Sequence, residues 1–167
     1  MVRLAIVSDT HIPSRASAIP DWVETEIEAA DHVIHAGDFD DQDTLDRIES
    51  LADGSLTAVS GNMDPVSLGL PTVDSISVGG RTFVAFHGTG SPTGYESRVR
   101  ERVTSATDAA DPIAVSGHTH EVLDDGGDGD VRILNPGSAT GASPASEVTM
   151  MRATVENGAV AVDVLRP

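Results

Sequence analysis

Several polar turns along the sequence carry side chains that can bind divalent metal ions. Each turn follows a short apolar run and combines histidine, aspartate or asparagine with small neighbours. The turns are Asp9-Thr10-His11, Gly37-Asp38, Gly61-Asn62, His87-Gly88 and Gly117-His118-Thr119-His120. Oxygen and nitrogen ligands without sulfur suit Mn²⁺, Zn²⁺, iron or Ni²⁺. The residue types therefore predict a metal centre whose ligands come from distant parts of the chain.

The candidate ligands in these turns are too numerous for one tetrahedral metal site. Asp9 and His11 are two residues apart, and so are His118 and His120. In an extended chain the members of each pair point to the same side. Two ions that share a bridging aspartate would use the whole set. Because centres with two ions about 3.5–4 Å apart are typical of enzymes that cleave phosphoesters, the ligand set favours phosphoester hydrolysis.

The apolar runs before these turns predict strands that alternate with helices. Strands are expected over Arg3–Asp9, His32–Asp38 and Leu56–Asn62, and helices over Ile19–Ala30 and Asp41–Ala52. This alternation is typical of βαβ units and a parallel sheet. Ligand sites of open α/β sheets gather beyond the carboxyl ends of the strands. We therefore expect the polar turns to converge on one crevice.

The second half of the chain has a different pattern. Val73–Val78 and Arg81–His87 flank Gly79-Gly80, which is a two-residue hairpin signal. The other predicted elements are a helix over Tyr95–Thr107 and strands over Ile113–Gly117, Val131–Leu134, Glu147–Val155 and Ala159–Leu165. We expect the last three strands to form an antiparallel tail. The predicted fold class is α/β, a two-sheet β-sandwich flanked by α-helices, in a single domain over residues 1–167.

The composition is strongly acidic. The 167 residues include 27 acidic and 10 basic side chains, every basic residue is an arginine, and the formal net charge is −17. Affinity for nucleic acids and anionic membranes depends on clusters of lysine and arginine. The charge therefore argues against both as partners, except for very short oligonucleotides in high salt. Molar salt screens carboxylate repulsion, and the acidic excess predicts a halophilic source.

Neither a cysteine nor a long apolar segment is present. The lack of cysteine excludes disulfides, zinc fingers and thiol catalysis. The longest apolar runs, such as Leu4–Val7, are far below the ~18 residues of a membrane span. No signal-peptide pattern precedes the first predicted strand. We therefore expect a cytoplasmic protein.

The turns together resemble the motifs of the calcineurin-like metallophosphoesterases, above all those of the small single-domain bacterial and archaeal phosphodiesterases. The matching segments, in unbroken order, are Ser8-Asp9-Thr10-His11, His35-Ala36-Gly37-Asp38, Gly61-Asn62-Met63-Asp64, His87-Gly88, Gly117-His118-Thr119-His120 and Asn135-Pro136-Gly137-Ser138. The resemblance implies a sandwich of two sheets between helices. It also implies hydrolysis of phosphodiesters, more than of phosphomonoesters, as the activity.

The resemblance further implies a role for each candidate ligand. One ion would be held by Asp9, His11, Asp38 and His120. The second ion would be held by Asp38, Asn62, His87 and His118. A hydroxide that bridges the two ions would attack phosphorus, so Asp38, Asn62 and His118 are expected as catalytic residues around it. Mn²⁺ is the expected metal, with Zn²⁺, iron and Ni²⁺ as alternatives.

Several residues near the predicted ligands have two interpretations. Arg15 either binds a substrate phosphate or forms a surface ion pair. Asp64 either caps a turn or supports Asn62 or His87 from behind. Met63 stands where many relatives have a histidine thought to protonate the leaving group, and methionine has no proton to donate, so the substrate range is left open.

Other polar residues are interpreted as structural. His32 and His35 are expected to be satisfied core histidines, and Asn135–Ser138 a turn that braces the site. The carboxylates that follow Asp38, up to Asp46, are expected at a solvated helix start. Asp124–Asp130 lacks the EF-hand register and its closing glutamate, which favours a solvated hairpin tip over a calcium loop.

A second function comes from a different class of protein. The same fold serves as a scaffold subunit in the eukaryotic retromer coat, which acts by binding partner proteins. That scaffold lacks part of the histidine set, whereas this sequence keeps every predicted ligand, and this difference favours an enzyme. The expected partner is a small phosphoester substrate, and the sequence leaves a homo-oligomer open.

Overall fold

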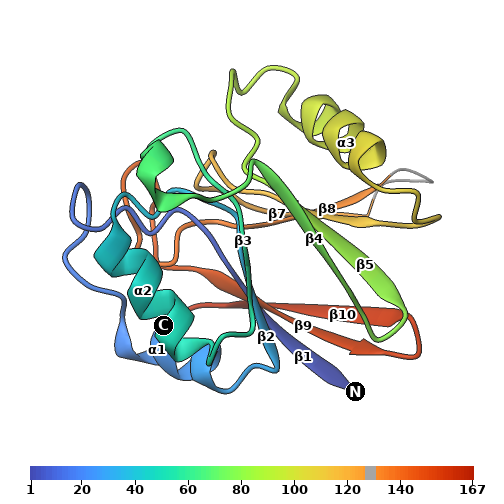
Figure 1. Cartoon of the computed structure of the whole chain (residues 1–167), viewed down its shortest axis with the longest axis horizontal. Helices are drawn as coiled ribbons and strands as arrows, with labels where there is room; N and C mark the ends of the chain where they lie inside the picture. Colours follow the sequence, from blue (N-terminus) through green and yellow to red (C-terminus); the bar gives the residue numbers. More distant parts are fainter. Residues whose placement is uncertain (127–130) are drawn as a thin grey trace.

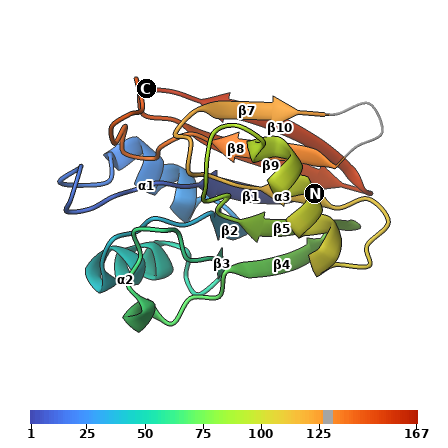
Figure 2. The same ribbon diagram turned by 90° about the horizontal axis from the view of Figure 1, so that it is seen from above.

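Two five-stranded sheets pack face to face in the computed structural model, which describes residues 1–126 and 131–167 (Figures 1 and 2). The strand order is β10-β9-β1-β2-β3 in the first sheet and β4-β5-β6-β8-β7 in the second. Helices α1 and α2 cover the outer side of the first sheet, and α3 covers the outer side of the second. The predicted sandwich with flanking helices is confirmed. Residues 127–130 of the predicted hairpin tip lie outside the described residues.

The first sheet has a parallel centre that an antiparallel hairpin extends. Its strands are β1 (Val2–Val7), β2 (His32–His35), β3 (Leu56–Ala58), β9 (Met150–Glu156) and β10 (Ala159–Leu165). The crossovers contain α1 (Asp21–Glu28) and α2 (Gln42–Leu51). Val7 pairs with His35, and His35 with Ala58. The parallel strands therefore end together at one edge of the sheet.

The second sheet begins with the predicted hairpin. Its strands are β4 (Val73–Val78), β5 (Arg81–Phe86), β6 (Ile113–Val115), β7 (Val122–Asp125) and β8 (Arg132–Pro136). Gly79 and Gly80 join β4 to β5 with φ values of 59° and 84°, which a two-residue turn of this kind requires. A 3₁₀ turn over Val66–Leu68 precedes β4, and α3 (Tyr95–Ala106) lies between β5 and β6.

The prediction of one antiparallel tail is wrong in part. β9 and β10 do form an antiparallel hairpin, but β8 lies in the other sheet and runs parallel to β6. Ile133 and Leu134 point to opposite faces of β8 and are both fully buried, because α3 covers one face and the first sheet the other. A strand buried on both faces shows no alternation that would reveal its neighbours. β7 is not predicted either, since its second half, Asp124-Asp125, has the composition of a turn.

Successive residues of the central strands pack into opposite layers of the core. Ile6 and Ile34 pack between the sheets, whereas Val7 and Val33 pack under α1 and α2. All of these side chains are buried. The strand ends that carry the polar turns are therefore held from both faces, as a site built on rigid elements requires.

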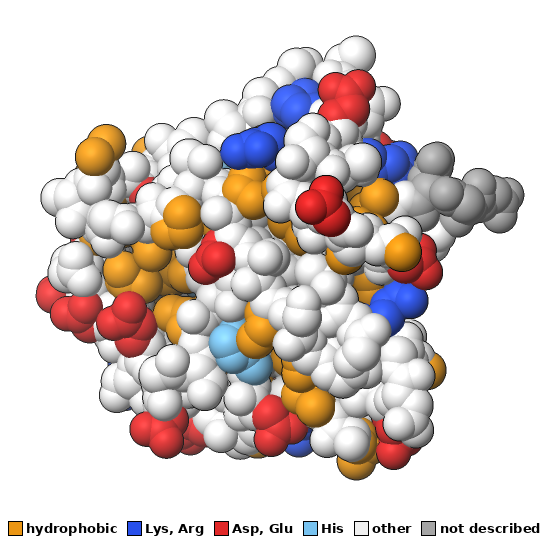
Figure 3. Space-filling model, turned by 45° about the vertical axis from the view of Figure 1, so that its right-hand side comes forward, with side chains coloured by type: hydrophobic (Ala, Val, Ile, Leu, Met, Phe, Trp, Pro, Cys, Tyr) orange, Lys and Arg blue, Asp and Glu red, His pale blue; other side chains and the backbone are white. Residues whose placement is uncertain are grey.

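Acidic side chains are spread over the surface. Figure 3 shows them scattered over one face, with most of the arginine side chains in its upper part. Arg47 pairs with Glu24 at 2.6 Å and Arg132 with Asp124 at 2.8 Å. Since the sequence has 27 acidic residues and only 10 arginines, the arginines are too few to neutralise most of the carboxylates. In the described part of the chain, no helix has the length and apolar composition needed to cross a bilayer.

Candidate metal centre

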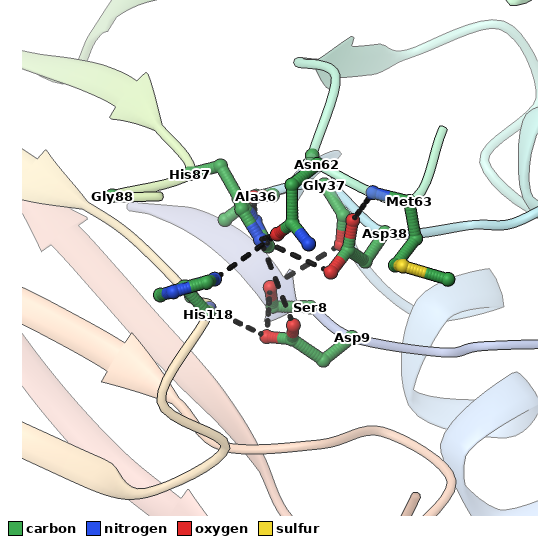
Figure 4. Close-up of polar contacts among 12 residues, drawn as sticks. Ser8, Asp9, Ala36, Gly37, Asp38, Asn62, Met63, His87, Gly88 and His118 are labelled. Carbon is green, nitrogen blue, oxygen red and sulfur yellow. Dashed lines mark hydrogen bonds and ion pairs between the residues drawn. The ribbon is translucent and has the colours of Figure 1, made fainter. Parts of the chain in front are cut away.

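The polar turns that were predicted to converge meet where the parallel strands of both sheets end. Figure 4 shows the side chains of Asp9, Asp38, Asn62 and His87 pointing toward one another, with His118 beside them. Backbone hydrogen bonds join the turns: the Asp9 N–H donates to the Gly37 carbonyl at 3.0 Å, and the Gly117 N–H donates to the His87 carbonyl at 3.0 Å. The main chain itself therefore holds the ligand-bearing turns together.

The first group of ligand atoms contains Asp9, His11 and His120. Oδ1 of Asp9 lies 3.3 Å from Nε2 of His120 and 3.7 Å from Nε2 of His11. The two Nε2 atoms are 3.2 Å apart. These three residues can offer one ligand atom each within 4.8 Å of one another, and all three are buried. This spacing fits the ligands of a single ion.

The second group gathers around Asp38 and His87. Oδ2 of Asp38 lies 3.1 Å from Nε2 of His87 and 3.4 Å from Nε2 of His11, so this oxygen faces both groups. Oδ1 of Asn62 lies 3.2 Å from Nε2 of His87 and 3.1 Å from Nδ1 of His118. Asp9 also reaches this group, since its Oδ1 is 4.0 Å from Nε2 of His87. The structure thus brings every predicted ligand into two adjoining clusters.

The carboxylate of Asp9 provides a direct test of whether a metal ion fits. Its Oδ2 accepts hydrogen bonds from the Ser8 hydroxyl at 2.7 Å and from the His118 N–H at 3.1 Å. Its Oδ1 is buried and makes no hydrogen bond to any described residue. A buried carboxylate oxygen without a partner is costly. A cation bound at Oδ1 would remove that cost, so the donor set fits a metal.

Three of the histidines are held in orientation by hydrogen-bond contacts of the ring nitrogen that faces away from the centre. Nδ1 of His87 bonds the Ala36 carbonyl and Nδ1 of His120 bonds the Ala142 carbonyl, both at 2.7 Å. Nε2 of His118 lies 2.9 Å from the Gly90 carbonyl oxygen and also 3.3 Å from the Gly90 N–H nitrogen, so its contacts hold the ring without fixing the position of its proton. Because a carbonyl only accepts, Nδ1 of His87 and Nδ1 of His120 carry the proton, and Nε2 of each ring presents a lone pair to the centre. Metal-ligating histidines are held in this way.

Asp40 is a site residue that the sequence did not indicate. It was expected at a solvated helix start, but its side chain is only 9% exposed and its Oδ1 lies 2.9 Å from Nδ1 of His11. The next carboxylate, Asp41, does cap the N-terminus of α2, since its side chain accepts a hydrogen bond from the Thr44 N–H at 2.9 Å. A carboxylate that is hydrogen-bonded to the outer ring nitrogen of a ligating histidine raises the basicity of that histidine and fixes the orientation of its ring. Asp40 therefore completes the orientation of His11.

The electrostatics of the cluster attract positive charge. Burial disfavours ionised Asp9, but its contacts with His11 and His120 outweigh burial and hold the pKa of Asp9 well below its usual range. Burial likewise opposes the charge on Asp38, yet the contact with His87 lowers the pKa of Asp38. Burial lowers the pKa of His87, but Asp38 and Asp9 raise it above its usual value overall. The carboxylates that favour a proton on these rings would favour a metal ion in the same place.

The turns adopt backbone conformations that side-chain-bearing residues rarely adopt. Apart from Asp53 and Asn157, the described non-glycine residues with positive φ are site residues, namely Asp9, His11, Asp38, Asp40, His118 and His120. Such conformations cost of order 1–3 kcal/mol each and concentrate at functional sites. They also explain why β1, β2 and β6 end before the ligands, whereas the predicted strands extended into them.

Glycines let the turns approach more closely than other residues would. A Cβ atom added to Gly61 would lie 2.0 Å from Oδ1 of Asp38, and one added to Gly117 would lie 2.0 Å from the Ser8 hydroxyl. No side chain can occupy either position without displacing a ligand or its support. The Gly-Asn and Gly-His pairs of the sequence are therefore explained by crowding.

Asp64 joins two of the ligand-bearing turns through main-chain groups. Its side chain accepts hydrogen bonds from the N–H groups of Asp38, Phe39 and Asp40 at 2.7–3.0 Å and from that of Gly61 at 2.8 Å. The contacts are thus with the turn that carries Asp38 and with the residue before Asn62. They are not with the side chains of Asn62 or His87.

Arg15 lies on the surface near the 143–144 segment. Its Nη1 donates to the Ser143 carbonyl at 2.9 Å. No carboxylate of residues 1–126 and 131–167 forms an ion pair with it, so the surface ion pair expected as one interpretation is not observed there. Its exposed guanidinium leaves the phosphate-binding interpretation as a proposal.

The remaining polar residues have the surroundings of structural groups. Nδ2 of Asn135 donates to the Gly117 carbonyl at 3.0 Å, and the Ser138 hydroxyl donates to the Asp9 carbonyl at 2.7 Å, so this turn does brace the site. His32 and His35 both bond a threonine hydroxyl. Burial lowers the pKa of both rings, which are therefore neutral near pH 7.

Known proteins match the chain over most of its length. Residues 2–158 match the calcineurin-like phosphoesterase superfamily domain. The chain is 35% identical over 139 residues to the "Probable metallophosphoesterase" of Methanocaldococcus jannaschii, a match that covers 82% of this chain and 68% of that protein.

Solved structures of Vps29 share the fold. Vps29 of Chaetomium thermophilum has a TM-score of 0.79 at 21% identity, with 100% of both chains covered. Vps29 of Entamoeba histolytica complexed with zinc has a TM-score of 0.74 at 23% identity, with 98% of both chains covered. At these identities the likeness shows the fold.

Proposed function

Because the chain belongs to the calcineurin-like phosphoesterase superfamily, we propose that it is a metal-dependent phosphoesterase that prefers phosphodiesters to phosphomonoesters. The position of Asp38 carries the proposal. Its Oδ2 lies between Nε2 of His11, at 3.4 Å, and Nε2 of His87, at 3.1 Å. An oxygen that faces both ligand clusters is what a bridging ligand requires, and two bridged ions are typical of phosphoester cleavage.

The proposed ligands divide into two sets that share Asp38. Asp9, His11, Asp38 and His120 would hold one ion, and Asp38, Asn62, His87 and His118 the other. When bound, divalent ions lower the pKa of water toward neutrality and stabilise charge on phosphoryl oxygens. Asn62 is exposed and His118 half-exposed, whereas the other ligands are buried, so these two form the side that substrate would reach. We propose Mn²⁺ first, with Zn²⁺, iron and Ni²⁺ as alternatives.

The charge of the loaded centre supports an anionic substrate. The ions would carry more positive charge than the aspartates remove, inside a chain of net charge −17. Phosphate anions would therefore be attracted to the centre and repelled by most of the remaining surface. Arg15 is the proposed additional contact for a substrate phosphate.

A scaffold function is the alternative that the fold supports. Vps29 of Entamoeba histolytica shares the fold and binds zinc in its solved complex, so metal binding alone would not distinguish an enzyme from a scaffold. Turnover distinguishes them, because a scaffold needs no reactive centre.

The test is a metal-dependent activity screen of the purified chain. After treatment with a chelator, the protein would be reloaded with Mn²⁺, Zn²⁺, Fe²⁺ or Ni²⁺ and its metal content measured. Bis-p-nitrophenyl phosphate, p-nitrophenyl phosphate and cyclic nucleotides are the substrates. We expect activity to disappear with the metal and to return with Mn²⁺, with the diester hydrolysed faster than the monoester. Stoichiometric metal without turnover of any substrate would favour the scaffold.

We also propose that the fold is adapted to high salt. Unpaired carboxylates repel one another at low ionic strength, and molar salt reduces the Debye length to about 3 Å. The Tm should therefore rise between low salt and molar KCl, by about 2–4 °C for each kcal/mol of repulsion relieved. Thermal melts in KCl, with sucrose of equal osmolality as the uncharged control, measure the effect. A Tm that stays flat in KCl, or that rises equally in sucrose, would contradict charge screening as the cause.

A further inference from the structure

His35 is a buried histidine that stands beside the metal centre without belonging to it. It is the last residue of β2, three positions before Asp38, and its relative exposure is 0%. Its ring stacks on the Phe39 ring with 3.6 Å between centroids and 20° between planes. The ring is therefore fixed in place, and what its two nitrogens contact can be stated.

The contacts of His35 define where its proton lies. Nδ1 faces the Gly37 N–H at 3.1 Å and must accept that hydrogen bond. The proton is therefore on Nε2, which lies 3.3 Å from the Thr10 hydroxyl oxygen. The Thr10 hydroxyl in turn donates to the Asp38 carbonyl at 3.2 Å. Burial lowers the pKa of His35 to about 3, which agrees with a neutral ring.

This chain of hydrogen bonds connects the two turns that carry the central ligands. Thr10 lies between Asp9 and His11, while Gly37 and Asp38 form the turn after β2. Asp9, His11 and Asp38 all have positive φ, with values of 53°, 46° and 63°. Strained residues of this kind keep their conformation only where the surroundings over-determine it. The hydrogen bonds that link His35 to Thr10, and Thr10 to the Asp38 carbonyl, are part of the surroundings that hold these residues in place.

We infer that His35 and Thr10 are positioning residues that set the separation between the Asp9/His11 turn and the Asp38 turn, and thereby the affinity for the metal ions. The inference rests on the proposed function only in taking these turns as metal-binding. Supporting residues around metal ligands typically change metal affinity by 10–100-fold when they are altered. An effect of this size distinguishes positioning from simple core packing.

A second histidine of the same strand provides a matched control. Nε2 of His32, at the other end of β2, lies 2.8 Å from the Thr57 hydroxyl. This pair has the same chemistry as His35 and Thr10 but lies away from the ligand turns. Substitutions of His32 should lower stability without changing metal affinity.

The experiment compares His35→Asn and Thr10→Val with Thr10→Ser and His32→Asn. Asparagine keeps an acceptor for the Gly37 N–H but is too short to reach Thr10, and valine has no hydroxyl. The Kd for Mn²⁺ would be measured by calorimetry on the folded proteins, far below the Tm of each. We expect about 10–100-fold weaker binding for His35→Asn and Thr10→Val. Thr10→Ser and His32→Asn should bind like the wild type.

Nitrogen-15 NMR of the wild-type chain tests the hydrogen-bond pattern even if a variant does not fold. We expect the His35 ring to carry its proton on Nε2 and to remain neutral over the whole pH range in which the protein stays folded. A proton on Nδ1, or unchanged Kd values in His35→Asn and Thr10→Val, would overturn the inference. If the wild type binds Mn²⁺ but cleaves no phosphoester, the proposed activity fails, while the Kd comparison still decides the role of His35.

Discussion

Replacement of Asp38 by asparagine is expected to release bound metal and to abolish hydrolysis. The substitution keeps the shape of the side chain, and the amide oxygen can still accept the hydrogen bond that Oδ1 receives from the Met63 N–H at 2.8 Å. It removes the charge that faces both His11 and His87. Since changes around a ligand already cost 10–100-fold in metal affinity, we expect a larger loss for the shared ligand itself. Metal content after dialysis and turnover of an aryl phosphodiester measure the two effects.

Asp43→Asn is the matched control for this prediction. Asp43 lies in the first turn of α2 and is exposed, so the same chemical change there should leave both metal content and turnover unaltered. His120→Ala and His87→Ala test the division into two sites, because His120 lies in the Asp9 group and His87 beside Asp38. We expect each variant to lose mainly one ion. An Asp38→Asn protein that keeps two ions per chain and near-normal turnover would contradict the bridging role.

The convergence of the ligands could be predicted because it depends on two periodic features of the sequence. Strand-like runs recur with helices between them, and each run ends in a turn with polar and small residues. Parallel strands place such turns at one edge of a sheet. The hydrogen bond from the Asp9 N–H to the Gly37 carbonyl shows that two of these turns do lie side by side. The candidate ligand set follows from topology, without any knowledge of side-chain conformations.

The support of the ligands could not be predicted, because it depends on dihedral angles. Asp40 follows Asp38 in a run of carboxylates that reads as a helix start, and only its φ of 85° turns it toward His11. Three of the four N–H groups that Asp64 accepts from likewise belong to the Asp38–Asp40 turn, in which Asp38 and Asp40 have positive φ. Sequence periodicity carries no signal for such single-residue conformations. The sheet to which β8 belongs could not be predicted for another reason: because both faces of this strand are buried, its sequence lacks the alternation of apolar and polar residues.

Met63 is expected to determine how strongly the turnover of a substrate depends on its leaving group. The residue is 43% exposed, and its side chain lies beside Asp38 in Figure 4 and has no proton to donate. Protonation of a leaving group by a positioned acid contributes about 10²–10⁴-fold, and it matters most for strongly basic alkoxides. We therefore expect nitrophenyl diesters to react much faster than alkyl phosphomonoesters. A Met63→His variant should gain up to about 10²–10⁴-fold on poor leaving groups and change little on nitrophenyl diesters. Rates for a series of diesters of graded leaving-group pKa measure the difference.

Met63→Gln is the control, because glutamine has a similar length and a polar end but cannot act as an acid near neutral pH. The slope of log kcat/KM against leaving-group pKa should be steep and equal in the wild type and in Met63→Gln, and shallower in Met63→His. Equally shallow slopes in all three proteins would show that another group supplies the proton. The half-exposed His118, which lies 3.1 Å from the Asn62 side chain on the open side of the centre, would then be the group to replace next. In that case Met63 would act only through packing, and the preference for aryl esters would have to come from contacts with the retained part of the substrate.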